Sequence, residues 1–198
     1  IPMLTEIGLP FAVHGRASGI TAPYCWLDVN NRSAFLRATE FLLDLGHRRI
    51  ALINGLEFMD FAHRRRAGYA EALRGRGIAL DPVLMRSDEM TEVYGYRSAI
   101  EMLALPDPPT AFLTASMITA LGVRRASDEA GLAMGRDLSI VTHDDALSYL
   151  LNGGDVPIFT ATRSSVREAG RQLAQMLIDR ITDPAAPPPT RLLEAELM

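Results

Sequence analysis

Residues 32–53 read RSAFLRATEFLLDLGHRRIALI, and this stretch decides which class of fold the chain can form. Its apolar side chains recur near helical spacing, at Phe35, Leu36, Ala38, Leu42, Leu43 and Leu45. Gly46 follows as a C-cap, because glycine readily takes the left-handed backbone conformation in which many helices end. The apolar run 50–53 then has the length of a short buried strand. The stretch therefore predicts a helix over 32–45 and a strand over 50–53.

The same alternation runs through the rest of the chain. Further strands are expected over 11–14, 83–86, 110–114, 138–142 and 158–161, and a last one near 191–193. Further helices are expected over 63–74, 91–103, 116–130 and 165–181. Parallel strands need crossover connections, which the helices supply, so the predicted class is α/β with parallel sheets flanked by helices. In such sheets ligands bind beyond the carboxyl ends of the strands.

The composition is that of an ordinary globular chain. It has 198 residues, of which 48% are hydrophobic and 22% charged, and a formal net charge of -4. A nucleic-acid-binding surface needs a basic excess, so this segment is not expected to bind DNA by itself. No apolar run approaches the ~20 residues that span a bilayer, no signal peptide is visible, and we expect a cytoplasmic protein with no membrane contact.

Cysteine and histidine usage argues against a disulfide or a metal site. Cys25 is the single cysteine, and a lone thiol cannot form an internal disulfide. The four histidines are scattered without the spacing of metal ligands, at His14, His47, His63 and His143. Sequence signatures of serine hydrolases, phosphate-binding loops and dinucleotide-binding loops are also missing. The sequence therefore predicts a binding protein rather than an enzyme, with no cofactor and no metal.

Polar side chains follow almost every predicted strand, where a ligand is expected. The candidates of this kind are His14, Ser116, His143, Asp144 and Arg163. A guanidinium can serve two acceptor oxygens and a carboxylate can accept from two hydroxyl donors, so such a set suits the hydroxyls of a sugar.

Several candidates have more than one interpretation. Asp144, the first of the Asp144-Asp145 pair, contacts a ligand, caps a turn or takes part in catalysis. The run Arg64-Arg65-Arg66 either binds phosphate at a helix N-terminus or forms a solvated face. Neighbouring helical positions point about 100° apart, so at most one or two of the three face a cleft.

Five segments carry a more specific signal. They are LGHRRIA at 45–51, RRAGY at 65–69 with Ala72-Leu73, PTA at 109–111 with ALG at 120–122, LSIV at 138–141 with Asp144-Asp145, and the stretch 160–170. In this order they resemble the LacI/GalR family of bacterial transcription regulators. The resemblance covers nearly the whole chain.

The resemblance implies a two-lobed fold, similar to that of periplasmic sugar-binding proteins, with the ligand between the lobes. Residues 1–29 and 165–190 are expected in the lobe nearer the DNA, and residues 30–164 and 191–198 in the distal lobe. Family members also carry an N-terminal helix-turn-helix domain. That domain and the first βα units of the DNA-proximal lobe are expected to be missing from these residues.

The resemblance also implies roles for single residues. Arg65 matches the arginine that clamps the effector, and Asp144 matches the effector-binding aspartate. Met90 lies in a loop where members place an aromatic side chain against the ligand. Ser116 stands where many members have a longer Asn or Asp, and His14 follows a strand whose end faces the ligand.

The implied function is that of a sensor. A small sugar-like effector changes the operator affinity of a homodimer, with Leu121 at the dimer interface and DNA bound only through the N-terminal domain. One alternative is a periplasmic sugar-binding protein of a transport system, which has the same architecture. Another is an α/β enzyme that uses His143 and Asp144.

Overall fold

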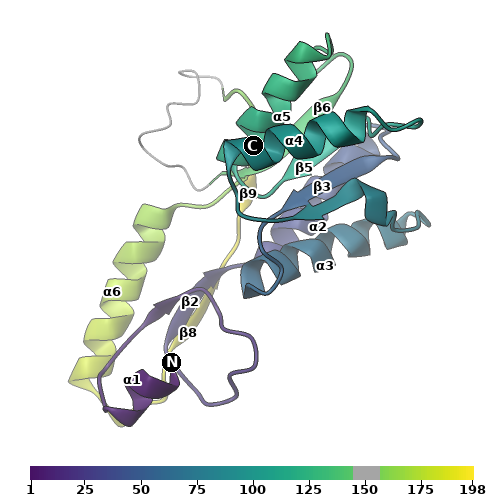
Figure 1. Cartoon of the computed structure of the whole chain (residues 1–198). Helices are drawn as coiled ribbons and strands as arrows, with labels where there is room; N and C mark the ends of the chain where they lie inside the picture. Colours follow the sequence, from purple (N-terminus) through teal and green to yellow (C-terminus); the bar gives the residue numbers. More distant parts are fainter. Residues whose placement is uncertain (145–156) are drawn as a thin grey trace.

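The computed structural model describes residues 1–144 and 157–198. Within these residues the strands form two sheets, one of three strands in the order β1-β2-β8 and one of six in the order β4-β3-β5-β6-β7-β9. Figure 1 shows the two sheets in separate parts of the molecule, here called the small part and the large part. Every strand pair recorded in these residues is parallel except β7 with the short β9. The predicted α/β class with parallel sheets is therefore confirmed.

The large part holds most of the helices. Its elements are α2 (Asn31–Asp44), β3 (Ile50–Asn54), α3 (Asp60–Gly75), a 3₁₀ turn (Pro82–Leu84), β4 (Met85–Ser87), α4 (Glu92–Leu103), β5 (Ala111–Thr114), α5 (Met117–Glu129), β6 (Ser139–Asp144), β7 (Thr160–Arg163) and β9 (Glu196–Leu197). Helices α2 and α3 pack together on one face of the sheet, and α4 and α5 pack together on the other. The sheet is thus buried on both faces.

The residues of β3 show how both faces are filled. Ile50 and Leu52 belong to the core under α2 and α3, whereas Ala51 and Ile53 belong to the core under α4 and α5. Successive side chains of a strand point to opposite faces, so a strand covered on both sides must be apolar throughout. This is why the continuous run 50–53 predicted the strand.

The small part is built from α1 (Pro2–Glu6), β1 (Val13–His14), β2 (Trp26–Val29), α6 (Val166–Thr182) and β8 (Thr190–Leu193). Its core is a cluster of Cys25 and Leu27 from the β2 segment with Ala169 and Met176 from α6. Figure 1 shows α6 running alongside the small sheet.

Along the described residues the chain passes between the two sheets at three places: after Val29, after Arg163 and after Leu193. The first two crossings fall where the sequence division puts its boundaries. The third does not, because residues 190–193 pair with β2 in the small sheet rather than joining the large part. The sequence division assigned residues 191–198 to the distal lobe. The strand pairing puts the boundary after Leu193 instead.

Local predictions held where the pattern was strong. Helix α2 ends as expected, and Gly46 beyond it has a φ of +95°. Ser116 caps α5 by accepting a hydrogen bond from the Thr119 amide, as its position before that helix predicted. Strand β7 lies two residues later than the predicted 158–161. Strand β2 was missed, because Asp28 interrupts its short apolar run.

Candidate functional site

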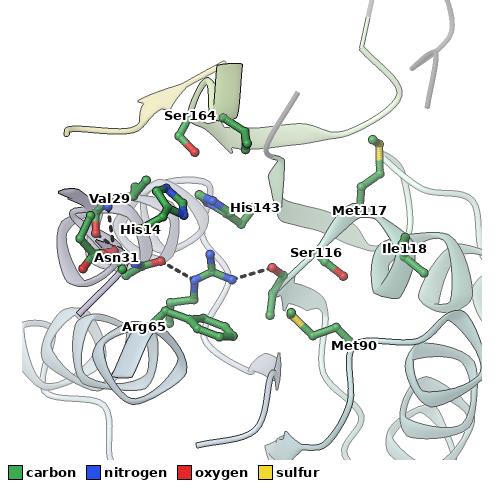
Figure 2. Close-up of a pocket in the computed structure, with 15 residues that line it drawn as sticks. His14, Val29, Asn31, Arg65, Met90, Ser116, Met117, Ile118, His143 and Ser164 are labelled. Carbon is green, nitrogen blue, oxygen red and sulfur yellow. Dashed lines mark hydrogen bonds between the residues drawn. The ribbon is translucent and has the colours of Figure 1, made fainter. Parts of the chain in front are cut away.

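A cavity of about 380 Å³ lies between the two parts, at the carboxyl ends of strands from both sheets. Its polar lining consists of His14, Asp28, Asn31, Arg65, Ser116, His143 and Ser164. Its apolar lining consists of Val29, Phe61, Met90, Ala115, Met117, Ile118 and Val166. Figure 2 shows Met90, Met117 and Ile118 on one side of the cavity and His14, Asn31 and Arg65 on the other. One wall of the cavity is therefore mainly polar and the other mainly apolar, although Val29 lies on the first and Ser116 on the second.

Arg65 forms the floor of the polar side. It lies on the second turn of α3 and is buried. Its Nε donates to Asn31 Oδ1 at 2.8 Å and its Nη1 donates to the Ala115 carbonyl at 2.7 Å, as Figure 2 shows. The guanidinium also lies about 5 Å from the centres of the Phe35 and Phe61 rings, at 5.1 and 4.9 Å. These contacts hold a buried cation in one orientation at the cavity wall.

The neighbouring arginines point elsewhere. Arg64 pairs with Asp60, and Arg66 pairs with Glu57. Of the run Arg64-Arg65-Arg66, Arg65 is the residue that lines the cavity. This agrees with the expectation that at most one or two members of the run could face a cleft.

His143 stands near the end of β6 and is buried against the cavity. Its Nδ1 is 3.0 Å from the hydroxyl of Thr162 on β7. Burial, together with the positive charge of Arg65, holds the pKa of His143 well below its ordinary value. The ring is therefore neutral near pH 7, with one nitrogen able to donate and the other able to accept.

Three further predicted residues also line this cavity. His14 is exposed at the end of β1, Ser116 precedes α5, and Met90 lies in the loop before α4. The structure thus brings His14, Arg65, Met90 and Ser116 together although they are far apart in the sequence. Their roles in binding stay predictions.

Two predicted residues fall outside this group. Arg163, at the end of β7, lines an adjoining cavity of about 350 Å³ together with Ser165, Glu168 and Glu194. The backbone of Asp144 pairs with that of Arg163, but the Asp144 side chain lies outside what the structure describes, as does Asp145. Leu121 is half-buried on α5, where it packs against the core under α4 and α5.

Sequence reasoning missed several lining residues, above all Asp28 and Asn31. Asp28 is a buried carboxylate in β2 that accepts from the Val29 amide and from Arg16 Nε, at 2.9 and 2.8 Å. A charged residue inside the apolar run 26–29 was the available signal. Met117 and Ile118 directly follow the predicted Ser116, so the first turn of α5 was the place to look for them.

A hydrogen bond from a loop of the small part to α3 also joins the two parts. Ser18, in the loop between β1 and β2, donates to Asp60 at the N-terminus of α3 at 2.9 Å. Burial alone would raise the pKa of Asp60, but hydrogen bonds from Arg64 and Ser18 outweigh it and lower the pKa. The loop is thus held against α3 by a charged acceptor.

Two negative findings apply to residues 1–144 and 157–198. No three His, Cys, Asp or Glu side chains in that part of the chain gather closely enough to hold a metal ion. None of its helices is both long and apolar enough to cross a membrane.

Comparison with known proteins decides the family. Residues 39–198 match the periplasmic binding protein-like domain family. This chain belongs to that family. Over its whole length the domain is also 45% identical to the HTH-type transcriptional regulator AglR of Rhizobium meliloti (strain 1021), of which it spans 56%.

Solved structures place the domain in the LacI group. A regulatory protein of the LacI family from Chloroflexus aggregans has a TM-score of 0.87 and 28% identity, covering 99% of this chain and 69% of that one. The complex of the transcriptional regulator CelR with cellobiose has a TM-score of 0.89 and 31% identity, covering 99% and 59%. The resemblance to LacI-type regulators and the predicted periplasmic-binding-protein-like fold are confirmed. These relatives are named as regulators rather than enzymes, and the LacI-type domain spans about half the length of the curated relatives it matches.

Proposed function

We propose that this LacI-type domain senses a small sugar-like effector in the cavity between its two parts, and that the effector changes the operator affinity of a longer regulator. The observation that carries the proposal is the buried Arg65 guanidinium, fixed by hydrogen bonds at the floor of a cavity that both parts line. A ligand that touches both parts favours one relative orientation over another by its difference in affinity for the two.

The lining suits a polyhydroxylated ligand with an apolar face. A sugar ring presents hydroxyls at its edge and C–H groups on its faces. Arg65 and Ser116 supply hydrogen-bonding groups, and Met90 and Met117 supply apolar surface. The volume of about 380 Å³ falls in the range of roughly 300–1,000 Å³ that small-molecule sites occupy. The CelR relative that binds cellobiose supports a sugar as the ligand.

The proposal assigns a role to each of the predicted site residues. Arg65, Ser116, Met90 and His14 contact the effector. Asp144 and Arg163, whose backbones pair at the ends of β6 and β7, contribute from the same edge of the large sheet.

The wider regulator completes the proposal. It acts in the cytoplasm as a homodimer, with Leu121 at the interface, and binds operator DNA through a domain outside these residues. The domain is proposed to bind its ligand without transforming it. AglR and CelR, both transcriptional regulators, favour this function over that of a transport protein.

The test begins with ligand binding. Thermal shift against a panel of mono- and disaccharides and nucleosides, with cellobiose included, should give a hit whose affinity is then measured by calorimetry. Arg65→Ala should weaken binding by about 10- to 100-fold, as the loss of a charged hydrogen-bonding group does. Arg66→Ala, next to it on the outer side of α3, should bind as the wild type does.

A second variant separates binding from folding, because Arg65 also supports the structure around it. His14 is exposed, so His14→Ala should fold normally and still weaken binding. Equal affinities in wild type, Arg65→Ala and His14→Ala would contradict the proposed site. A panel that yields no ligand at all would contradict sensing of a sugar or nucleoside.

A further inference from the structure

A series of hydrogen bonds, buried except at Arg16, links Arg65 to the small part. Arg65 Nε donates to Asn31 Oδ1 at 2.8 Å, and Asn31 Nδ2 donates to Asp28 Oδ1 at 3.4 Å. Asp28 Oδ2 in turn accepts from Arg16 Nε at 2.8 Å. We call Arg16, Asp28, Asn31 and Arg65 the relay.

Asn31 has its amide fixed at both ends. Its Nδ2 also donates to the Val29 carbonyl at 3.0 Å, while its oxygen faces Arg65. The side chain is buried, and a flipped amide would set its NH₂ group against the guanidinium and its oxygen against a carbonyl and a carboxylate. One orientation of Asn31 is therefore strongly favoured, and this orientation presents an acceptor to Arg65.

Asp28 holds Asn31 from the side of the small sheet. Its Oδ1 accepts hydrogen bonds from the Val29 backbone N–H and from Asn31 Nδ2, and its Oδ2 accepts one from Arg16 Nε. Arg16 itself lies over the Trp26 ring, 5.1 Å from the ring centre. The carboxylate is thus anchored within the small part.

The relay passes through the first crossing between the two parts. Arg16 and Asp28 belong to the small part, Asn31 is the first residue of α2, and Arg65 lies on α3 of the large part. A rotation of one part against the other about residues 29–31 moves Asp28 relative to Asn31. The acceptor offered to Arg65 therefore depends on the relative orientation of the two parts.

We propose that Asn31, held by Asp28 and Arg16, is a positioning residue that sets the Arg65 guanidinium and couples it to the orientation of the two parts. The proposal rests on the proposed function, in which Arg65 contacts the effector. By this proposal Arg16 affects the orientation of the Arg65 guanidinium, although Arg16 does not itself line the main cavity.

The chain offers a matched pair of arginines for the test. Arg16 and Arg64 line the same crevice of about 320 Å³, and each pairs with a carboxylate whose side chain is 6% exposed. Arg16 belongs to the relay, whereas Arg64 pairs with Asp60. Arg16→Gln and Arg64→Gln therefore each remove an ion pair between a part-buried arginine and a buried carboxylate, one inside the relay and one outside it.

The first readout needs no ligand. Arginine Nε–H signals are recorded by ¹H–¹⁵N NMR, the Arg65 signal is assigned from its loss in Arg65→Lys, and its hydrogen exchange with water is measured. Asn31→Ala and Arg16→Gln should speed exchange of the Arg65 Nε–H by about tenfold or more, whereas Arg64→Gln should leave it as in the wild type. If Asn31→Ala fails to fold, Arg16→Gln still decides, because its side chain is partly exposed. Equal exchange in Arg16→Gln and Arg64→Gln would overturn the proposal.

The second readout is calorimetry with cellobiose as the probe. Arg16→Gln should weaken binding by about tenfold relative to Arg64→Gln, although neither arginine lines the main cavity. Arg16→Gln and Arg64→Gln could bind cellobiose equally well while the Arg65 Nε–H exchanges faster in Arg16→Gln. That result would support the positioning of Arg65 by Asn31 but overturn the coupling of the relay to ligand binding. A wild type that does not bind cellobiose counts against that sugar in the proposed function, and the exchange measurement then decides the relay by itself.

Discussion

Gly68 of α3 lies directly against the backbone carbonyl of Arg32 on α2, with no room for a β-carbon between them. Helices α4 and α5 meet in the same way, through Gly95 and Gly122. In both pairs glycine lets two helix backbones approach closely. Gly68 lies one turn beyond Arg65 on α3. The close approach therefore also fixes how far Arg65 lies from α2.

Gly68→Ala should destabilise the protein by about 1–3 kcal/mol, because the added methyl overlaps a backbone atom that cannot rotate away. Urea denaturation measures the free energy of unfolding. Gly75→Ala, at the exposed end of the same helix where nothing lies within 4 Å, should leave stability unchanged or slightly higher. Equal stabilities for the two variants would contradict the close approach.

Tyr69→Phe should cost about 1–2 kcal/mol, because it removes a buried hydrogen bond and leaves an acceptor with one partner fewer. The Tyr69 hydroxyl donates to the Ile50 carbonyl at 2.7 Å and so ties α3 to β3. Tyr96→Phe is the control, since that hydroxyl donates to Glu129 at the surface and its loss should change stability little. Chemical denaturation of both variants checks the difference, and a Tyr69→Phe protein as stable as the wild type would count against it.

Stability should fall as the pH drops below about 6.5, partly through His143. Burial, with the charge of Arg65, lowers the pKa of His143 in the folded protein. The unfolded chain therefore takes up a proton first, near the ordinary value of 6.5, and unfolding becomes more favourable below it. Above that value the contribution to stability is complete.

His143→Gln should make this pH dependence shallower. The free energy of unfolding is measured between about pH 7.5 and 5 in both proteins. A residual slope should persist from His47, whose pKa burial also lowers. Identical slopes in the variant and the wild type would show that His143 is not held neutral.

Met90→Ala should weaken binding of any sugar found in the ligand screen by about three- to tenfold, since it removes apolar contact area worth on the order of 1 kcal/mol. Met90 lines the cavity and is half-buried, so the fold should tolerate the change. Met59→Ala, at an exposed position outside the cavity lining, is the control and should bind as the wild type does. Calorimetry compares the two, and an unchanged affinity in Met90→Ala would place the ligand away from the apolar side.

The sequence predicted the class of fold from elements such as α2 and β3. Their periodicities are local, 3.6 residues for a helix and two for a strand, and apolar side chains on a buried element have to follow them. It also predicted that polar groups would gather at strand ends, because parallel strands carry their carboxyl ends to one edge. Arg65, Ser116, Met90 and His14, which line the cavity, were chosen as candidates in this way and through the family resemblance.

Asp28 and Asn31 show where such reasoning stops. Asp28 places a charge inside the apolar run of β2, so no strand was predicted there, and Asn31 looks like any polar residue at the start of a helix. Their importance comes from partners in distant segments, Arg16 and Arg65, to which no local pattern refers. The shifted third crossing has the same origin, because the pairing of β8 with β2 joins segments about 160 residues apart.

The alternation of helices and strands and the burial of the large sheet on both faces were therefore determined by the sequence itself, because each follows from spacing along the chain. Which arginine of the run 64–66 faces the cavity, where the chain crosses between the sheets, and how Arg65 is tied to the small part were decided only by the tertiary structure. These depend on hydrogen bonds and strand pairs between distant residues, which form only once both sheets are in place.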